Sequence, residues 1–170
     1  MVEEVNISIQ DEKFMDMARE VAQKSLDPNT KVGACIVKNG EVLSLGFNDI
    51  PKGYPSKKFP WARTGNPLET KYLFVIHAEL NSITSYKGLK EDLEGATIYV
   101  TLFPCNECAK LIIQSGIKEV VYECDKYANT DSVIASKMLL DECGVKYRQI
   151  GVTLDIEMEK KEQDKVKKLI

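Results

Sequence analysis

Two short segments of this chain carry residue types that could bind a metal ion and use it for chemistry. The segment HAE places Glu79 two residues after His77, and the segment PCNEC places Cys105 and Cys108 three residues apart. Thiolate and imidazole are ligands that zinc prefers in proteins. His77 is the one histidine of the chain, so chemistry that needs an imidazole has a single candidate. The Cys-x-x-Cys spacing alone is also typical of redox pairs and structural zinc sites, which leaves these alternatives open.

The number of available ligands favours a catalytic zinc site over a structural one. A structural site is closed by four protein ligands, whereas His77, Cys105 and Cys108 make three and leave one position for water. Zinc lowers the pKa of a bound water to about 7 in catalytic sites, and that water needs a neighbouring acid and base. Glu79 is the candidate for this role, although a glutamate at such a spacing is ordinarily a surface residue.

Both segments follow an apolar or strand-like run and open a predicted helix. The free N–H groups and positive dipole end of a helix N-terminus favour the thiolate form of a cysteine. Pro104 stands where helix starts tolerate proline. Cys105 and Cys108 then lie on one face of one helical turn, so both sulfurs can reach the same metal ion.

The elements that must position these residues follow from the hydrophobic pattern. Apolar residues at offsets of four, seven and eight from Phe14 predict an amphipathic helix over 11–24. Two β-rich segments joined by Asn39-Gly40 predict a hairpin. The predicted strands cover 33–38, 41–47, 96–101, 119–123 and 145–150, and the later helices cover 76–86, 105–115 and 131–142. A hairpin followed by β-α units predicts an α/β fold with helices on both faces of one sheet.

The segment 48–71 differs in kind from the rest of the chain. It holds four of the six prolines, and its five basic side chains stand against two acidic ones in an acidic protein. Such composition predicts a long loop, and the charge excess fits either a solvated loop or an anion site. Arg63 is the preferred phosphate contact, because its planar guanidinium suits phosphate and Trp61 could fix its orientation.

The overall composition limits the class of protein. The chain has 170 residues, 44% of them hydrophobic, and a net charge of −3, so we expect one domain over residues 1–150 that binds neither nucleic acid nor membrane. The acidic start of the chain and the lack of a long apolar run predict a cytosolic (cytoplasmic) protein. Five cysteines indicate reduced thiols, with Cys35 and Cys124 as small core residues. Residues 151–170 form a charged C-terminal extension that we expect to be helical.

The metal-binding segments match the zinc deaminase signature H-x-E followed by P-C-x-x-C. Further segments, among them VGACIVKNG, PWARTGNPLETKYLFVIHAELNSI and IYVTLFPCNECAKLIIQSGIKEVVYECDKY, resemble the deoxycytidylate branch of the cytidine and deoxycytidylate deaminases. The likeness covers roughly residues 11–150. It implies a cytidine-deaminase-like three-layer α/β/α fold with a mixed five-stranded sheet. It also implies hydrolytic deamination of dCMP to dUMP and ammonia, which supplies dUMP for thymidylate synthesis.

The resemblance assigns roles to particular residues. It implies one zinc ion per chain on His77, Cys105 and Cys108, with Glu79 as the proton shuttle, in agreement with the interpretation of the residues themselves. It further implies that Asn48 holds the sugar, that the Ala78 backbone meets the base and that Tyr127 helps to close the nucleotide pocket. The alternatives for these three are a turn asparagine, a helix spacer and a surface tyrosine.

The resemblance also implies a homo-oligomer, often a hexamer in this family, with dCTP and dTTP as effectors. The chain departs from the family pattern in the effector region, where it has Asp49 after Gly46-Phe47-Asn48 and Tyr54 after Gly53. The residues leave two alternatives to deamination of dCMP. The first is a deaminase of the same fold that acts on another cytosine nucleoside or nucleotide, a free base or tRNA adenosine, and the second is a zinc module without activity, which would have no use for Glu79.

Overall fold

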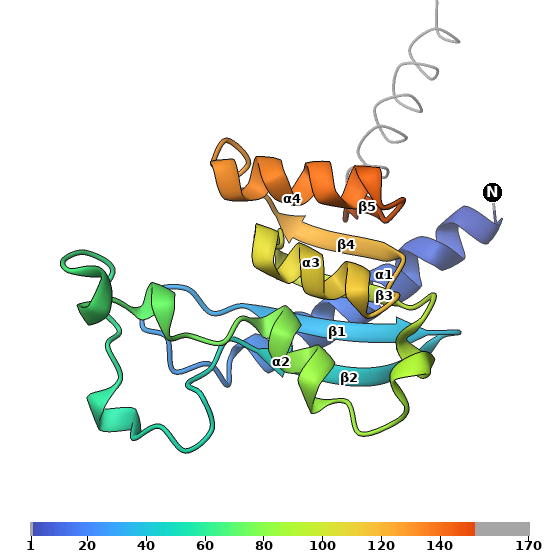
Figure 1. The fold of residues 1–170 in the computed structure, drawn as a ribbon. Helices are drawn as coiled ribbons and strands as arrows, with labels where there is room; N and C mark the ends of the chain where they lie inside the picture. Colours follow the sequence, from blue (N-terminus) through green and yellow to red (C-terminus); the bar gives the residue numbers. More distant parts are fainter. Residues whose placement is uncertain (1, 152–170) are drawn as a thin grey trace, which may run out of the picture.

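A mixed sheet of five strands forms the centre of the protein (Figure 1). The computed structural model describes residues 2–151. The strand order is β2-β1-β3-β4-β5, in which β1 pairs antiparallel with β2 and β3, while β3, β4 and β5 are parallel. The strands are β1 (Gly33–Lys38), β2 (Glu41–Phe47), β3 (Thr97–Leu102), β4 (Glu119–Cys124) and β5 (Lys146–Gln149). These strands agree with the predicted ones to within about one residue at most ends.

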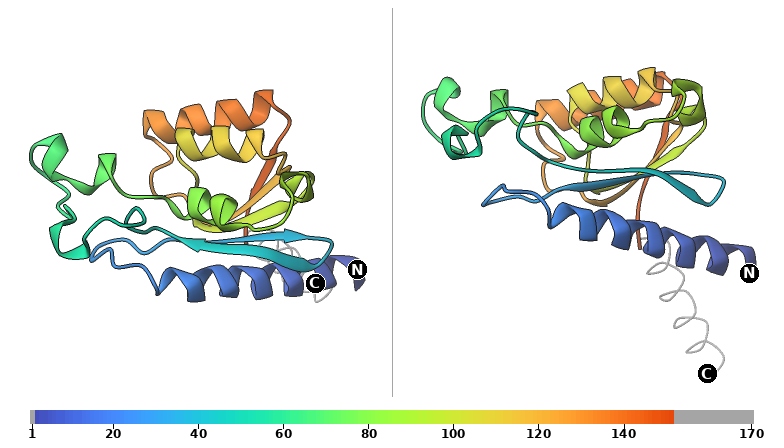
Figure 2. Two further views of the ribbon diagram at one scale, coloured as in Figure 1. Left: turned by 60° about the horizontal axis from the view of Figure 1, so that its bottom comes forward. Right: turned by 90° about the horizontal axis from the view of Figure 1, so that it is seen from below.

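Helices cover both faces of this sheet, as Figure 2 shows. One face carries α1, and the other carries α2, α3 and α4. The helices are α1 (Val2–Ala22), α2 (Ala78–Ser85), α3 (Asn106–Gln114) and α4 (Asp131–Glu142). The three-layer α/β/α fold with a mixed five-stranded sheet is therefore confirmed.

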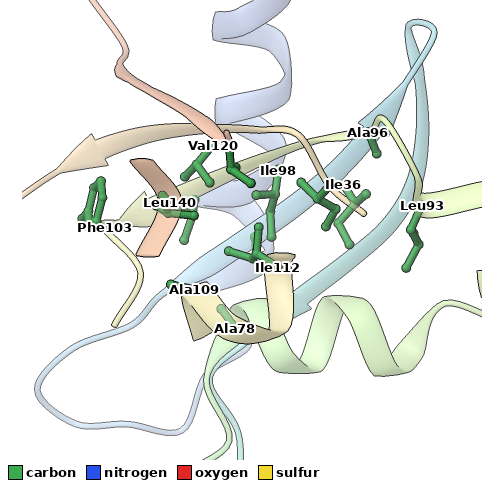
Figure 3. Close-up of a cluster of buried hydrophobic side chains, with 14 of the residues drawn as sticks. Ile36, Ala78, Leu93, Ala96, Ile98, Phe103, Ala109, Ile112, Val120 and Leu140 are labelled. Atoms are coloured by element: carbon green, nitrogen blue, oxygen red, sulfur yellow. The ribbon is translucent and has the colours of Figure 1, made fainter. Parts of the chain in front are cut away.

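Alternating side chains of the strands build a separate apolar core on each face. Cys35 and Val37 of β1 pack towards Phe14 of α1, while Ile36 belongs to the larger core under α2, α3 and α4. Figure 3 shows this larger core, where Ile36 lies near Ile112 of α3. Residues that alternate along a strand point to opposite faces, so one strand can serve both cores.

The observed helices correct two predicted boundaries. The first helix begins at Val2, not at residue 11, because nothing between residues 2 and 10 is a glycine or proline that would end it. The helix predicted over 76–86 begins at Ala78, because the backbone of Ile76 exchanges hydrogen bonds with the backbone of Asp49. The helix predicted within 151–170 falls almost entirely outside the described residues.

The segment 48–71 is a long excursion from the sheet that contains only short 3₁₀ turns (Figure 1). These turns are Ser56–Lys58, Pro67–Glu69 and, at its end, Lys71–Leu73. Asn66 caps the second turn by accepting a hydrogen bond from the backbone N–H of Leu68. The segment thus runs as the predicted loop, and its end returns to the start of α2. No helix within residues 2–151 has both the length and the apolar character needed to cross a bilayer.

Candidate metal centre and nucleotide pocket

His77, Cys105 and Cys108 bring their ligand atoms together at one point of the structure. The imidazole Nδ1 and the two sulfurs all lie within 4.8 Å of one another. Nδ1 is 3.4 Å from Sγ of Cys105 and 3.5 Å from Sγ of Cys108. Ligand atoms about 2.0–2.3 Å from a tetrahedral zinc ion lie about 3.5 Å apart. The spacing and the donor atoms therefore fit zinc, with the fourth position of the tetrahedron left to a non-protein ligand.

Two helix N-termini deliver these three ligands. His77 is the residue before the first turn of α2, and Cys105 holds the same position before α3. The backbone N–H of Cys108 points to Sγ of Cys105 at 3.5 Å, so the sulfur caps the helix. A helix start concentrates N–H donors and positive potential, and both favour a thiolate. The sequence motif PCNEC therefore encodes both the helix start and the ligand pair.

A glycine on the neighbouring strand lets α2 come close enough to the sheet to place its ligand. A Cβ atom built on Gly46 of β2 would lie 2.3 Å from the backbone nitrogen of Ser82. Asn81 further fixes the helix by donating from Nδ2 to the carbonyl of Phe47 at 2.9 Å. The hydroxyl of Ser44 donates to the carbonyl of Ser82 at 2.6 Å. The start of α2, and with it His77, is thus tied rigidly to β2.

Glu79 lies in the first turn of α2 and is buried, with 4% of its surface exposed. Burial raises the pKa of this carboxyl above its usual range, an effect that the nearby His77 partly opposes. A carboxyl whose pKa moves towards neutrality can both accept and return a proton at physiological pH. Glu79 therefore has the environment of an acid-base group and not that of a surface residue.

The three ligand side chains also influence one another electrostatically. The hydrogen bond with Cys105 raises the pKa of His77 to about 9, although burial acts in the opposite direction. Cys108 and His77 hydrogen-bond to Cys105 and lower the pKa of its thiol. Zinc binds the thiolate form of cysteine and the neutral form of histidine, so a zinc ion would displace the protons of these side chains. The cluster is therefore a polar, buried centre whose charges suit a metal ion.

The three ligand side chains, which we call the metal cluster, lie beside a cavity of about 400 Å³. His77, Glu79 and Cys105 form one part of its wall, and residues of α2, β3, α4 and the loops form the rest. The other lining residues are Asp27, Thr30, Val32, Asn48, Arg63, Lys71, Tyr72, Val75, Ala78, Leu102, Phe103, Tyr127, Thr130, Ser132 and Val133. A cavity of this size suits a small-molecule ligand that reaches the metal with one end.

All four residues expected at the nucleotide line this cavity, although they differ in exposure. Asn48 is buried, with 6% of its surface exposed, and Ala78 is fully buried. Tyr127 is 40% exposed and stands at the surface with Lys126 over its ring. Arg63 is exposed at the cavity wall. The structure thus brings Asn48, Ala78, Tyr127 and Arg63 around the same space as the metal cluster.

The expected support of Arg63 by Trp61 is wrong. Trp61 packs against Phe59 with ring centroids 4.5 Å apart, and the described residues show no cation–π contact between Trp61 and Arg63. The neighbour of Arg63 is instead Tyr72, which raises the pKa of the Arg63 guanidinium. Trp61 therefore packs within the loop, against Phe59. Tyr72, and not Trp61, is the aromatic residue beside Arg63.

Two charged residues of the cavity were missed by sequence reasoning. Asp27 and Lys71 form a buried ion pair between the segment after α1 and the end of the long loop. Asp27 precedes Pro28, a typical turn signal, but nothing in the sequence pairs it with a lysine 44 positions away.

Cys35 is fully buried, as expected, and burial raises the pKa of its thiol to about 12. Cys124 ends β4 and is partly exposed, so the prediction that it is a core residue is wrong.

Comparison with known proteins identifies relatives over most of the chain. Residues 8–124 match the family model described as the cytidine and deoxycytidylate deaminase zinc-binding region. The human deoxycytidylate deaminase is 48% identical over 140 residues, which are 81% of this chain and 78% of that protein. The probable deoxycytidylate deaminase of Drosophila melanogaster is 44% identical over 146 residues, 82% of this chain and 71% of that protein.

Solved structures give the same relatives in three dimensions. The dCMP deaminase of cyanophage S-TIM5, in complex with dCMP and dUMP, superposes with a TM-score of 0.63 at 28% identity. That match covers 81% of this chain and 94% of the cyanophage protein. The diaminohydroxyphosphoribosylaminopyrimidine deaminase/5-amino-6-(5-phosphoribosylamino)uracil reductase of Thermotoga maritima has a TM-score of 0.59 at 28% identity. That match covers 89% of this chain and 39% of the larger protein.

Proposed function

Since the chain belongs to the cytidine and deoxycytidylate deaminase family, we infer that it is a zinc-dependent hydrolase that converts dCMP to dUMP and ammonia. The cyanophage relative that shares its fold binds both dCMP and dUMP, the substrate and product of this reaction. The observation that carries the proposal is the buried Glu79 beside a three-ligand cluster at one end of a nucleotide-sized cavity. Through this reaction the enzyme supplies dUMP for thymidylate synthesis.

In this proposal His77, Cys105 and Cys108 hold one zinc ion per chain. The 3.4 and 3.5 Å separations between Nδ1 and the sulfurs support it. These three residues are also the one group among the described side chains whose ligand atoms lie close enough together to hold a metal ion. Zinc bound there supplies a Lewis acid that makes water nucleophilic near neutral pH. With three protein ligands, a zinc ion held there would have one position for water.

Glu79 moves the protons of the reaction. Its carboxylate takes a proton from the attacking water and gives it to N3 of the cytosine ring, while the water oxygen forms a bond to C4. The carboxylate then takes the second proton of that oxygen and delivers it to the amino group, whose bond to C4 breaks. The product carries a carbonyl at C4, and ammonia leaves. One buried carboxyl is enough for these transfers because it lies in the same cavity wall as His77 and Cys105.

The rest of the nucleotide would occupy the loop-lined end of the cavity. We assign the backbone of Ala78 to the base, Asn48 to the sugar, Arg63 to the 5′-phosphate and Tyr127 to the closure of the pocket, since all four line it. Arg63 has no carboxylate partner among the described ion pairs, so its charge is free for an anion.

We also propose that residues 1–150 form one domain, that the protein is a cytosolic homo-oligomer, and that dCTP and dTTP act as effectors. Exposed apolar side chains at the end of the long loop support the assembly. They are Leu68, which is 69% exposed, Leu73, which is 65% exposed, and Tyr72, which is 56% exposed.

A change of the dCMP saturation curve on addition of dCTP would support effector control, whereas a curve unmoved by dCTP and dTTP would show that Asp49 and Tyr54 abolish it.

A substrate panel tests the proposed function. The purified, zinc-loaded protein is offered dCMP, CMP, dCTP, deoxycytidine, cytosine and tRNA, and release of ammonia is measured. We expect dCMP to have the highest kcat/KM. An equal rate on deoxycytidine would instead make the protein a nucleoside deaminase, and activity confined to tRNA would make it a nucleic-acid deaminase of the same fold.

A further inference from the structure

A buried ion pair lies in the wall of the cavity, formed by two residues that do not belong to the group His77, Cys105 and Cys108. Lys71, in the last 3₁₀ turn of the long loop, directs its Nζ at Oδ2 of Asp27, which follows α1. The side chain of Lys71 is 7% exposed and that of Asp27 is 1% exposed, yet both line the cavity. A lysine is almost never this buried unless it is paired or used, so the pair needs an explanation.

Asp27 is held in place and ionised by its own neighbourhood. Its Oδ1 accepts hydrogen bonds from the backbone N–H groups of Asn29 at 2.8 Å and Thr30 at 3.1 Å. Burial acts to raise the pKa of this carboxyl, but the hydrogen bonds from Lys71 and from these N–H groups lower it below its usual value. Asp27 is therefore a fixed anion whose acceptor positions are filled from within the chain.

Lys71, in contrast, has donor capacity to spare. An ammonium carries three N–H donors, and the described residues accept one hydrogen bond from it, at Asp27. Its other near neighbour is the ring of Tyr72, whose centroid is 5.8 Å from Nζ. An ammonium in the wall of a cavity offers its remaining donors to whatever fills that cavity.

Asn48 stands beside this ammonium with one acceptor position left. Its Nδ2 donates to the carbonyl of Thr30 at 2.9 Å and to Oδ2 of Asp27 at 3.4 Å, the same oxygen that Lys71 reaches. Its Oδ1 accepts from the backbone N–H of Val32 at 2.8 Å. An amide oxygen has two lone pairs, so one remains for a ligand.

A free donor next to a free acceptor suits a hydroxyl group better than a phosphate. A hydroxyl gives one hydrogen bond and accepts another, so it can bridge Asn48 Oδ1 and Lys71 Nζ. A phosphate can only accept, and the charge of Lys71 is already balanced by Asp27. Arg63, without a carboxylate partner among the described ion pairs, is the better phosphate ligand. The deoxyribose of dCMP has a single free hydroxyl, at C3′.

We propose that Lys71 is a substrate-binding residue that donates a hydrogen bond to the 3′-hydroxyl of the nucleotide, with Asp27 as the positioning residue that fixes the ammonium. The proposal rests on the proposed function, because it assumes that a cytosine nucleotide fills the cavity. The 3′-hydroxyl donates in turn to Asn48. The ion pair thereby lets the enzyme recognise the sugar through two residues that are not zinc ligands.

Comparison of dCMP with 2′,3′-dideoxycytidine monophosphate, which lacks the 3′-hydroxyl, tests the proposal. For the wild-type enzyme we expect kcat/KM to be roughly tenfold or more lower with the dideoxy substrate, the effect of one lost charge-assisted hydrogen bond. The variant is Lys71→Met combined with Asp27→Asn, because removal of the lysine alone would leave a buried, unpaired carboxylate. This double variant should retain zinc and should accept both substrates with kcat/KM values that differ by less than about threefold.

Two further variants complete the experiment. Lys118→Met changes an exposed lysine that does not line the cavity and should keep the wild-type ratio between the substrates. Asp27→Asn with Lys71→Gln restores an uncharged donor and should recover part of the preference for dCMP. A double variant that binds zinc and still prefers dCMP as strongly as the wild type would overturn the proposal.

The wild-type enzyme alone can also refute it, even where a double variant does not fold. Equal kcat/KM values of the wild type for dCMP and its dideoxy analogue would show that the 3′-hydroxyl has no partner. A wild-type enzyme that deaminates neither nucleotide, but acts on another substrate of the panel, would overturn the proposed function itself and with it this inference.

Discussion

The two ends of the cavity are built in different ways. The metal end is made by residues at the starts of α2 and α3, within two short stretches of sequence, and Gly46 lets α2 pack directly on the sheet. The nucleotide end collects single residues from the segment after α1, the long loop and the turn before α4, among them Asp27, Arg63 and Tyr127. Rigid elements thus hold the groups that do chemistry, and loops hold the groups that choose the substrate.

This contrast predicts that changes at the metal end abolish the reaction for every substrate, whereas changes at the nucleotide end alter the choice among substrates. The fold supports the division, because α2 and α3 contribute to the larger apolar core, while the long loop extends away from the sheet.

The largest effect is expected when a metal ligand is removed. Cys108→Ala leaves two protein ligands, so zinc affinity and turnover should both fall to background for dCMP and deoxycytidine alike. Metal analysis together with the ammonia assay measures this. The exposed Cys143→Ala serves as the matched control and should keep its zinc and activity. Normal metal content and rate in Cys108→Ala would contradict the assigned ligand set.

A second effect at the metal end should come from packing alone. In Gly46→Ala the new methyl group would meet the backbone nitrogen of Ser82 at 2.3 Å, so α2 must shift. We expect a loss of stability on the order of 1–3 kcal/mol, as for other overpacked sites, and weaker zinc binding. Thermal unfolding and zinc titration measure the two effects. The neighbouring hairpin offers a control in Glu41→Ala, an exposed position that should change neither.

A smaller and more selective effect is expected at the nucleotide end. Arg63→Ala should lower kcat/KM for dCMP by roughly tenfold, the effect of one charge-assisted hydrogen bond, and should leave deoxycytidine unaffected. Steady-state kinetics on both substrates measure this. Lys57→Ala, which changes an exposed loop lysine outside the cavity wall, is the matched control. Equal losses of Arg63→Ala on both substrates would make Arg63 a structural residue and would remove the contrast between the two ends.

The same contrast explains which features could be predicted from the sequence. The strands, α3, α4 and the cluster of His77, Glu79, Cys105 and Cys108 depend on local patterns: apolar periodicity, a turn dipeptide and ligands at helix starts. The fold then brings the two motifs together, which follows from the order of the β-α units. The resemblance to a known family supplied Asn48, Ala78 and Tyr127, for which local patterns alone left other roles open.

The features that escaped prediction are contacts that no local sequence pattern specifies. The Asp27–Lys71 pair joins one turn that precedes the β1–β2 hairpin in sequence with one that follows it, and neither residue has a local signature of its partner. Closeness in sequence predicts that Trp61 orients Arg63, yet the loop folds so that Trp61 packs against Phe59. In a long proline-rich loop without a regular period, neighbouring residues need not point in a common direction, so sequence distance does not predict contact there.

The most direct test of the account is the combined zinc content and turnover of Glu79→Gln. Glutamine keeps the shape of the side chain but cannot take up or return a proton, so the variant should hold one zinc ion per chain and fold as the wild type does. We expect its kcat on dCMP to fall by roughly 100-fold or more, the usual contribution of a general acid and base. A zinc-loaded Glu79→Gln enzyme that kept a tenth of the wild-type rate would contradict the claim that this buried carboxyl is the sole proton shuttle.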